Sequence, residues 1–165
     1  MIFLANIIGV IAFIIFILSF QIKDRKKLLF YQMIANIFYS IQYALLNAFG
    51  AASLNIISSI RCLVFNKFKT KIPFYILLIF ILLIIGTLLY SYNGLISLLP
   101  VIISLIYVIT SYGNNMLIIR IGFLISAILW IIFNLNVGAY TSLIGNTFEI
   151  VSSLIAIFRH RKKTY

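Results

Sequence analysis

Apolar residues fill long runs of the chain, and short polar or charged stretches separate these runs. A run that crosses a bilayer as a helix needs about 20 mostly apolar residues. Runs of about this length lie near 2–22, 28–46, 51–67, 72–90, 95–111, 116–134 and 139–158. The stretches between them hold charges, amides, serine and glycine, which favour turns and loops. The pattern predicts an all-α membrane protein with seven transmembrane helices in a single domain, residues 1–165.

Small and cyclic residues within these runs indicate how the helices pack. Gly9, Gly86, Gly122 and Gly145 lack side chains, so we expect them to permit close contacts between helices. Pro100 lies inside the fifth predicted span. Because proline removes a backbone hydrogen bond within a helix, we expect a kink there.

Composition excludes an ordinary soluble domain. The chain is 64% hydrophobic and 9% charged, with a mean hydropathy of +1.20, whereas soluble domains are roughly half apolar and about a quarter charged. Its single cysteine, Cys62, lies in an apolar run, and its single histidine, His160, lies in the basic tail. This inventory excludes an intrachain disulfide, a cysteine–histidine metal site and a Ser-His-Asp triad. We therefore expect no cofactor, no metal and no enzymatic activity.

The net charge of +11 comes from short basic clusters between the apolar runs. They form no basic face with interleaved aromatic residues, so we expect no nucleic-acid partner. With seven spans, the clusters at 23–27, 67–71 and 159–163 and the residue Arg120 all fall on one side of the membrane. Basic residues favour the cytoplasmic side, and anionic lipid head groups attract them. This distribution predicts an outside N-terminus and a cytoplasmic C-terminus.

The first and last three spans have the same layout, which indicates an internal repeat. Superposing Gly50 on Gly138 aligns Leu29 with Leu117 and Ile56 with Ile144. The first unit covers 1–71, a linker helix lies in 72–92, and the second unit covers 93–165. Because a single linker helix restores the original direction, the two three-helix units are expected to be parallel repeats.

Two stretches of the first unit resemble a known family. They are Ser19-Phe20-Gln21 with the following basic cluster and 28–32, and the segment 42–52 followed by Asn55 and Arg61. They resemble the YgjV-like bacterial inner-membrane proteins, and the 3+1+3 layout resembles the SWEET sugar transporters and the wider PQ-loop superfamily. The resemblance implies a small-solute carrier in the bacterial inner membrane, with Gln21 in the loop motif. Phe20 stands where that motif has proline.

One acid lies deep in an apolar span. Glu149 is about ten residues from either end of the seventh span, which places it roughly 15 Å deep at about 1.5 Å per residue. Repeat alignment puts Arg61 at the equivalent place in the third span. Two interpretations stay open for Arg61 and Glu149: a buried ion pair that joins the units, or a site that binds substrate or couples protons. Arg120 is an alternative partner for Glu149, unless its side chain extends to the inner surface.

Polar residues recur at helical spacing in the same spans. Gln32 and Asn36 lie one turn apart in the second span, and Asn146 lies three residues before Glu149 in the seventh. Such residues also join helices to one another, so each is either a ligand of the substrate or a helix contact. Trp130 aligns with Gln42, and its place resembles that of the sugar-stacking ring in the SWEET fold. The candidate site residues are Glu149, Arg61, Asn146, Asn55, Ser58, Trp130, Gln42, Asn36 and Gln32.

These features favour a carrier that moves a small polar metabolite, such as a sugar, by alternating access between the two three-helix units. The alternative is a membrane protein that transports nothing and serves as an assembly or regulatory partner. The expected partners are the lipid bilayer and the solute. A chain with both units needs no second copy to complete a carrier, but the sequence leaves the formation of a homo-oligomer undecided.

Overall fold

The computed structural model of the protein describes residues 2–20, 22, 24–68, 72–113 and 115–161. Within these ranges the regular secondary structure is entirely helical, so the predicted all-α class is confirmed. The elements are α1 (Ile2–Phe20), α2 (Arg25–Leu45), α3 (Phe49–Lys67), α4 (Phe74–Gly86), the short α5 (Leu88–Ser91), the 3₁₀ helix η1 (Leu95–Ser97), α6 (Leu98–Tyr112), α7 (Met116–Val137) and α8 (Tyr140–Arg161).

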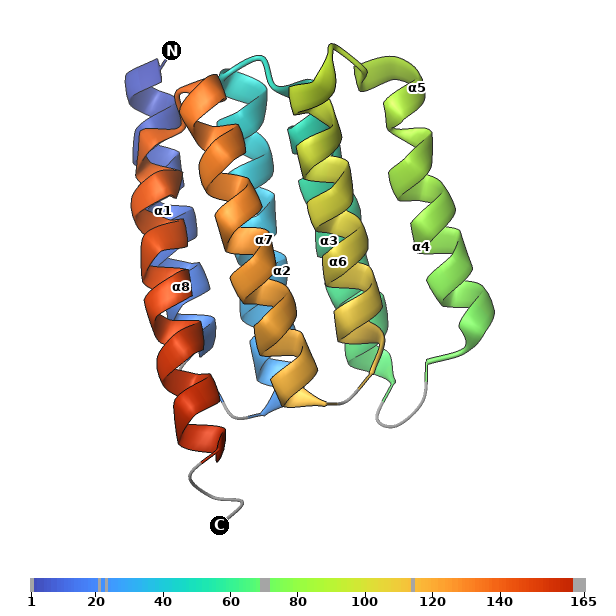
Figure 1. Ribbon diagram of the computed structural model, residues 1–165. Helices are drawn as coiled ribbons and strands as arrows, with labels where there is room; N and C mark the ends of the chain where they lie inside the picture. Colours follow the sequence, from blue (N-terminus) through green and yellow to red (C-terminus); the bar gives the residue numbers. More distant parts are fainter. Residues whose placement is uncertain (1, 21, 23, 69–71, 114, 162–165) are drawn as a thin grey trace.

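The long helices stand in two rows (Figure 1). The back row contains α1, α2 and α3, with α2 between the other two, and the front row contains α8, α7 and α6 in the same order across the view. The rows meet where α1 packs against α8 and where α3 packs against α6. Helix α4 lies at the edge of the bundle against α6 and α3.

Five helical segments are long and apolar enough to cross a membrane. Within the described residues they are Ile2–Ser19, Phe49–Lys67, Phe74–Ser91, Leu95–Tyr112 and Leu117–Val137. Helices α2 and α8 are as long as these, with 21 and 22 residues, but they carry more polar side chains. The structure therefore supports a multi-spanning membrane protein, while the count of seven spans stays a prediction.

Local capping interactions explain where α2 and α7 begin and end. The Asp24 carboxylate accepts a hydrogen bond from the Lys27 amide at 3.0 Å and so caps the N-terminus of α2. That hydrogen bond is the main reason why the pKa of the Asp24 carboxyl lies below its usual value. Helix α7 runs three residues beyond the predicted end at 134 because its end is set by Gly138, which has a φ of 78°.

The fifth predicted span is divided, and the expected kink at Pro100 is wrong. The 3₁₀ helix η1 precedes α6, and α6 begins at Leu98, so Pro100 lies in its first turn. Backbone N–H groups in a first turn have no partner within the helix, so proline removes no helical hydrogen bond there.

In the fourth span a one-residue interruption separates α4 from α5 at Thr87, whose hydroxyl donates to the Ile84 carbonyl at 2.7 Å.

Three of the four glycines expected at helix contacts lie at such contacts. A Cβ added at Gly9 would lie 2.4 Å from the Thr141 Oγ1 atom and 2.5 Å from the Gln42 Nε2 atom, so α1, α2 and α8 approach closely there. Gly122 faces Thr110, and Gly145 faces Phe13, at similarly short distances. The expectation is wrong for Gly86, since no atom of the described residues lies within 4 Å of a Cβ added there.

Replacing Gly9 by alanine is expected to destabilise the protein by about 2 kcal/mol, the typical cost of overpacking. The added methyl group must displace the amide of Gln42 and the hydroxyl of Thr141, which hydrogen-bond to each other at 3.2 Å. We expect the melting temperature in detergent to fall by about 4–8 °C. The control is Gly86→Ala, which introduces the same methyl group in open space and should leave the melting temperature unchanged or slightly raised. Equal effects of the two substitutions would contradict the close approach.

Candidate functional site

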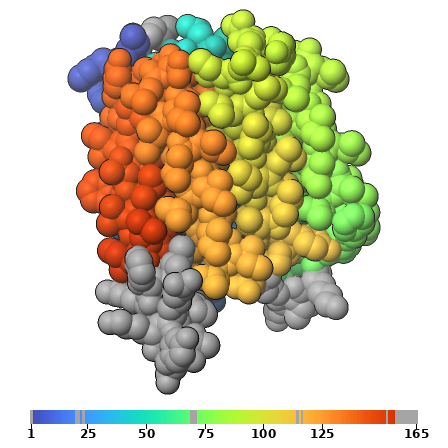
Figure 2. Space-filling model, viewed as in Figure 1, coloured from blue at the N-terminus to red at the C-terminus, as the bar shows by residue number. Residues whose placement is uncertain are grey.

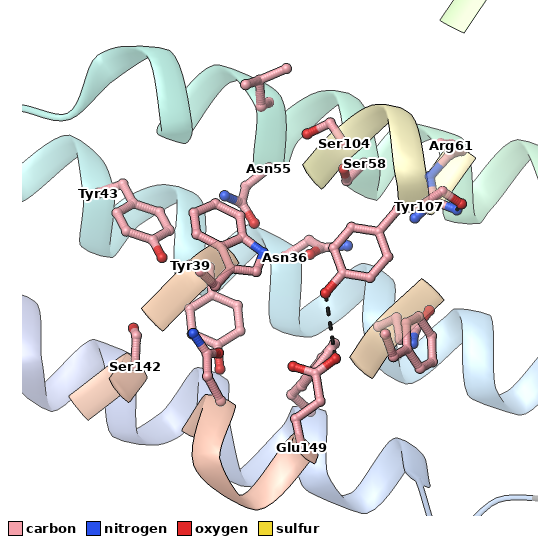
Figure 3. Close-up of a pocket in the computed structure, with 16 residues that line it drawn as sticks. Asn36, Tyr39, Tyr43, Asn55, Ser58, Arg61, Ser104, Tyr107, Ser142 and Glu149 are labelled. Carbon is pink, nitrogen blue, oxygen red and sulfur yellow. Dashed lines mark hydrogen bonds between the residues drawn. The ribbon is translucent and has the colours of Figure 1, made fainter. Parts of the chain in front are cut away.

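A small cavity lies between the two rows of helices, and every long helix except α4 contributes to its wall (Figure 3). Its volume is about 40 Å³, which is room for roughly three water molecules. The side chains of α8, α7 and α6 form a continuous surface on the face seen in Figure 2, so the cavity does not open there. Its lining residues are Phe16, Gln32, Asn36, Tyr39, Tyr43, Leu54, Asn55, Ser58, Arg61, Ser104, Tyr107, Phe123, Trp130, Ser142, Asn146 and Glu149.

Eight of the nine candidate site residues of the spans line this one cavity. The structure thus brings together side chains from α2, α3, α7 and α8 that are up to 117 residues apart, from Gln32 to Glu149. The exception is Gln42, which is fully buried beside α1 and α8. Its amide donates to Thr141 at 3.2 Å and accepts from Ser142 at 2.8 Å. The loop-motif residue Gln21 lies outside the described residues.

Glu149 is almost completely buried, with 1% of its surface exposed. Its only hydrogen bond within the described part of the chain comes from the Tyr107 hydroxyl, at 3.4 Å. Neither Arg61 nor Arg120 forms an ion pair with it among the residues that the structure describes. Glu149 therefore shares a cavity with Arg61 without pairing with it, which leaves the carboxylate with little to offset its charge.

Arg61 is directed to the C-terminal half of α6. Its guanidinium donates to the Ser111 hydroxyl and, at 3.4 Å, to the Tyr107 carbonyl. It also contacts the Cys62 sulfur at 3.6 Å and lies 5.8 Å from the centre of the Phe65 ring. The partial negative charge at the end of α6 favours a cation there. Tyr107 thus connects the two charged residues, since its carbonyl accepts from Arg61 and its hydroxyl donates to Glu149.

The candidate amides divide into two groups. Asn55 donates to the Ala51 carbonyl at 2.8 Å, and Asn36 donates to the Cys62 sulfur at 3.9 Å, so both contact protein atoms. In contrast, Gln32 Nε2 and Asn146 Nδ2 are buried and have no hydrogen-bond partner among the residues that the structure describes. A buried donor without a partner costs about 1–3 kcal/mol. These two groups are therefore the amides that are available to water or to a bound solute.

Aromatic rings form much of the rest of the wall. Trp130 stacks on Tyr43 with ring centres 5.4 Å apart and an angle of 11° between the planes. The Tyr43 hydroxyl donates to the Asn134 side chain at 2.7 Å, which joins α2 to α7. Phe16, Tyr39, Tyr107 and Phe123 also line the cavity, and the Tyr107 hydroxyl donates to Glu149.

Sequence reasoning identified Trp130 but none of the other rings, because aromatic residues are common throughout the apolar runs. One signal in α2 was available. Tyr39 and Tyr43 follow Gln32 and Asn36 at intervals of three and four residues, which places all four on the same face of a helix.

A hydrogen-bonded arginine closes the basic end of the bundle. Arg25, the first residue of α2, donates to two carbonyls at the end of α3. These are the Phe65 carbonyl in the last turn, at 3.4 Å, and the Phe68 carbonyl just after the helix, at 3.3 Å. It also donates to the Ser111 carbonyl of α6 at 3.3 Å. Arg25 and Arg61 therefore hold the ends of α2, α3 and α6 together on the side where the basic residues gather.

Comparison with known proteins agrees with these features. A family described as Imp-YgjV, bacterial inner membrane protein, matches residues 3–164. No curated protein and no solved structure matches the chain. The family match covers nearly the whole chain, and several helices are long and apolar enough to span a membrane. The chain therefore belongs to the YgjV family of bacterial inner membrane proteins.

Proposed function

We propose that this protein is a carrier that moves a small polar solute across the bacterial inner membrane by alternating access between two three-helix units. The observation that carries the proposal is the buried polar cavity, lined by α1, α2 and α3 from one unit and by α6, α7 and α8 from the other. In transporters built from repeats, the substrate site lies near the membrane midplane between the repeats. Nothing in the inventory of residues suggests an enzyme.

The proposed architecture is a 3+1+3 arrangement of the SWEET and PQ-loop type, with α4 as the linker. The packing supports it, because α1–α2, α2–α3 and α1–α8 contacts correspond to α6–α7, α7–α8 and α6–α3 contacts. Positions 88 residues apart also support it, since Phe16 and Ser104, Ser58 and Asn146, and Arg61 and Glu149 all line the cavity. A two-fold axis along the bundle relates such positions in parallel repeats.

We include α2 and α8 among seven spans, although they are more polar than the other five. At about 1.5 Å per residue their 21 and 22 residues are roughly 31–33 Å long, which matches the apolar thickness of a bilayer. Their polar residues are the ones that face the cavity, such as Gln32, Asn36, Asn146 and Glu149. An outside N-terminus and a cytoplasmic C-terminus follow from the basic residues Arg25, Lys26, Lys27 and Lys67, which lie at the end of the bundle away from Ile2.

Each end of the cavity has a polar closure that an alternating motion would break. On the side of the N-terminus, Tyr43 of α2 donates a hydrogen bond to Asn134 of α7. On the basic side, Arg61 of α3 donates hydrogen bonds to Ser111 and Tyr107 of α6. Both closures join one unit to the other, and both are formed here. The small volume of the cavity, about 40 Å³, is consistent with a closed state that must open before a metabolite enters.

The proposal predicts that purified protein in liposomes accelerates the entry of at least one small polar metabolite, such as a sugar, an amino acid or an amine. Trp130 is the only tryptophan and lines the cavity, so its fluorescence should change when that solute binds. The control variant is Arg120→Met, which removes a charge from a residue that does not line the cavity and should preserve both signals. A broad metabolite panel that produces neither flux nor a fluorescence change, together with stable co-purification of a stoichiometric protein, would favour the assembly-partner alternative.

A further inference from the structure

We propose that Glu149 and four aromatic rings that line the same cavity form a binding subsite for the positively charged ammonium group of a small amine. The inference rests on the proposed carrier function and deepens it, because it names the chemical class of the solute. Five cavity-lining side chains form this ammonium subsite, and they come from five helices: Phe16, Tyr39, Tyr107, Phe123 and Glu149.

The four rings contact one another in a chain. The centres of Phe16 and Tyr39 lie 6.1 Å apart, those of Phe16 and Phe123 lie 6.5 Å apart, and those of Phe123 and Tyr107 lie 5.5 Å apart. Tyr107 reaches Glu149 through its hydroxyl (Figure 3). Aromatic faces attract cations, most strongly where water is excluded. The rings attract an ammonium ion through their faces, and the carboxylate attracts it through its negative charge.

The charge of Glu149 points to the same kind of ligand. A buried carboxylate without a counter-charge is costly in a membrane interior, so it must either bind a proton or meet a cation. Arg61, which lines the same cavity, is engaged by Ser111 and Tyr107 instead. The hydrogen bond from Tyr107 to Glu149 is long, at 3.4 Å, so the carboxylate retains acceptor capacity for an incoming N–H group.

Two amide groups indicate what else the amine carries. Gln32 and Asn146 line the cavity, and their buried Nε2 and Nδ2 atoms have no hydrogen-bond partner within the described ranges. Asn146 precedes Glu149 by three residues and lies on the same face of α8. Both amides are hydrogen-bond donors, so they fit an oxygen acceptor on the solute. The ligand is thus a small amine that also bears a hydroxyl or carboxylate oxygen, of a size that a cavity of about 40 Å³ accommodates with little expansion.

A pair of probes with the same shape and different charge tests the inference. Ethanolamine carries an ammonium group at pH 7, while ethylene glycol has a hydroxyl in its place and is neutral. Binding is measured by the fluorescence of Trp130 and by thermal stabilisation of the whole protein in mild detergent. Sodium chloride is added to the ethylene glycol samples so that their ionic strength equals that of the ethanolamine samples. We expect the wild type to bind ethanolamine at least about tenfold more tightly than ethylene glycol.

Glu149→Gln keeps the shape of the side chain and removes its charge, so it should abolish this preference for the amine. Phe123→Leu keeps an apolar side chain and removes the aromatic face, so it should weaken ethanolamine binding about fivefold more than it weakens ethylene glycol binding. It provides a second route to the answer if Glu149→Gln does not fold. Arg120→Met serves as the control for the loss of a charge elsewhere and should retain the preference.

The outcomes separate the inference from the proposed function. Equal binding of the two probes by the wild type, or transport of neutral polyols alone, would overturn the ammonium subsite and leave the carrier intact. A preference for ethanolamine that survives in both Glu149→Gln and Phe123→Leu would also overturn it. If ethanolamine binds with the expected preference and no solute is moved in liposomes, the subsite holds and the carrier function fails.

Discussion

Replacing Arg61 by methionine is expected to lower the melting temperature by about 6–12 °C, the largest loss of stability that we expect from any charged residue. Arg61 is 4% exposed, and its guanidinium joins α3 to α6 through the Ser111 hydroxyl and the Tyr107 carbonyl. Hydrogen bonds to a charged group contribute about 1.5–3 kcal/mol each, so their loss should cost about 3 kcal/mol. For a chain of this size, 1 kcal/mol changes the melting temperature by about 2–4 °C.

Arg120→Met is the matched control for this substitution. Arg120 is half-buried in α7, and the described part of the chain provides no hydrogen bond to its side chain. We expect its replacement to change the melting temperature by less than about 2 °C. Similar effects of the two substitutions would mean that Arg61 contributes through its charge alone, and that its bonds to α6 are unimportant for stability.

Replacing Trp130 by alanine is expected to have an effect of similar size and to change the cavity as well. The ring stacks on Tyr43 and also contacts Phe133 with ring centres 5.5 Å apart. We expect the free energy of unfolding to fall by about 3 kcal/mol, which is at the lower end of the range for replacing a large buried side chain by alanine. The loss is at the lower end because lipid tails solvate an apolar ring better than water does. The predicted drop in melting temperature is about 6–12 °C.

Trp130→Phe distinguishes packing from cavity size. Phenylalanine keeps a ring that can stack on Tyr43, so it should restore most of the stability. Trp130→Ala enlarges the cavity and should therefore allow larger solutes to stabilise the protein than the wild type accepts. If the alanine variant is as stable as the wild type and accepts the same solutes, Trp130 forms no essential part of the cavity wall.

The helices themselves were predictable from the sequence because hydropathy is a local property. The seven predicted runs correspond to helical segments in the structure, with ends that differ by a few residues where capping decides them. The cap by Asp24 and the left-handed Gly138 explain two of these shifts. The Pro100 prediction failed for the same kind of reason, since the consequence of a proline depends on where its helix begins.

Polar residues within apolar runs were also a good guide to the cavity. A polar side chain that faces lipid is costly, so Gln32, Asn36 and Glu149 must face other helices or an internal space. Hydropathy alone does not distinguish these two environments. Gln42 illustrates the difference, because it is buried like Gln32 but is held by Thr141 and Ser142 beside the cavity.

The sequence by itself determined that this is a helical membrane protein and which side chains are too polar for lipid, because both follow from the run of residue types along the chain. Only the tertiary structure decided which of those side chains meet. It separates Glu149 from Arg61, connects them through Tyr107 and places aromatic rings from α1, α2, α6 and α7 in the wall of the same cavity. These contacts depend on how helices distant in the chain rotate and pack against each other. The rotation and packing of these helices are set by the close packing of many side chains at once, which no single stretch of sequence reveals.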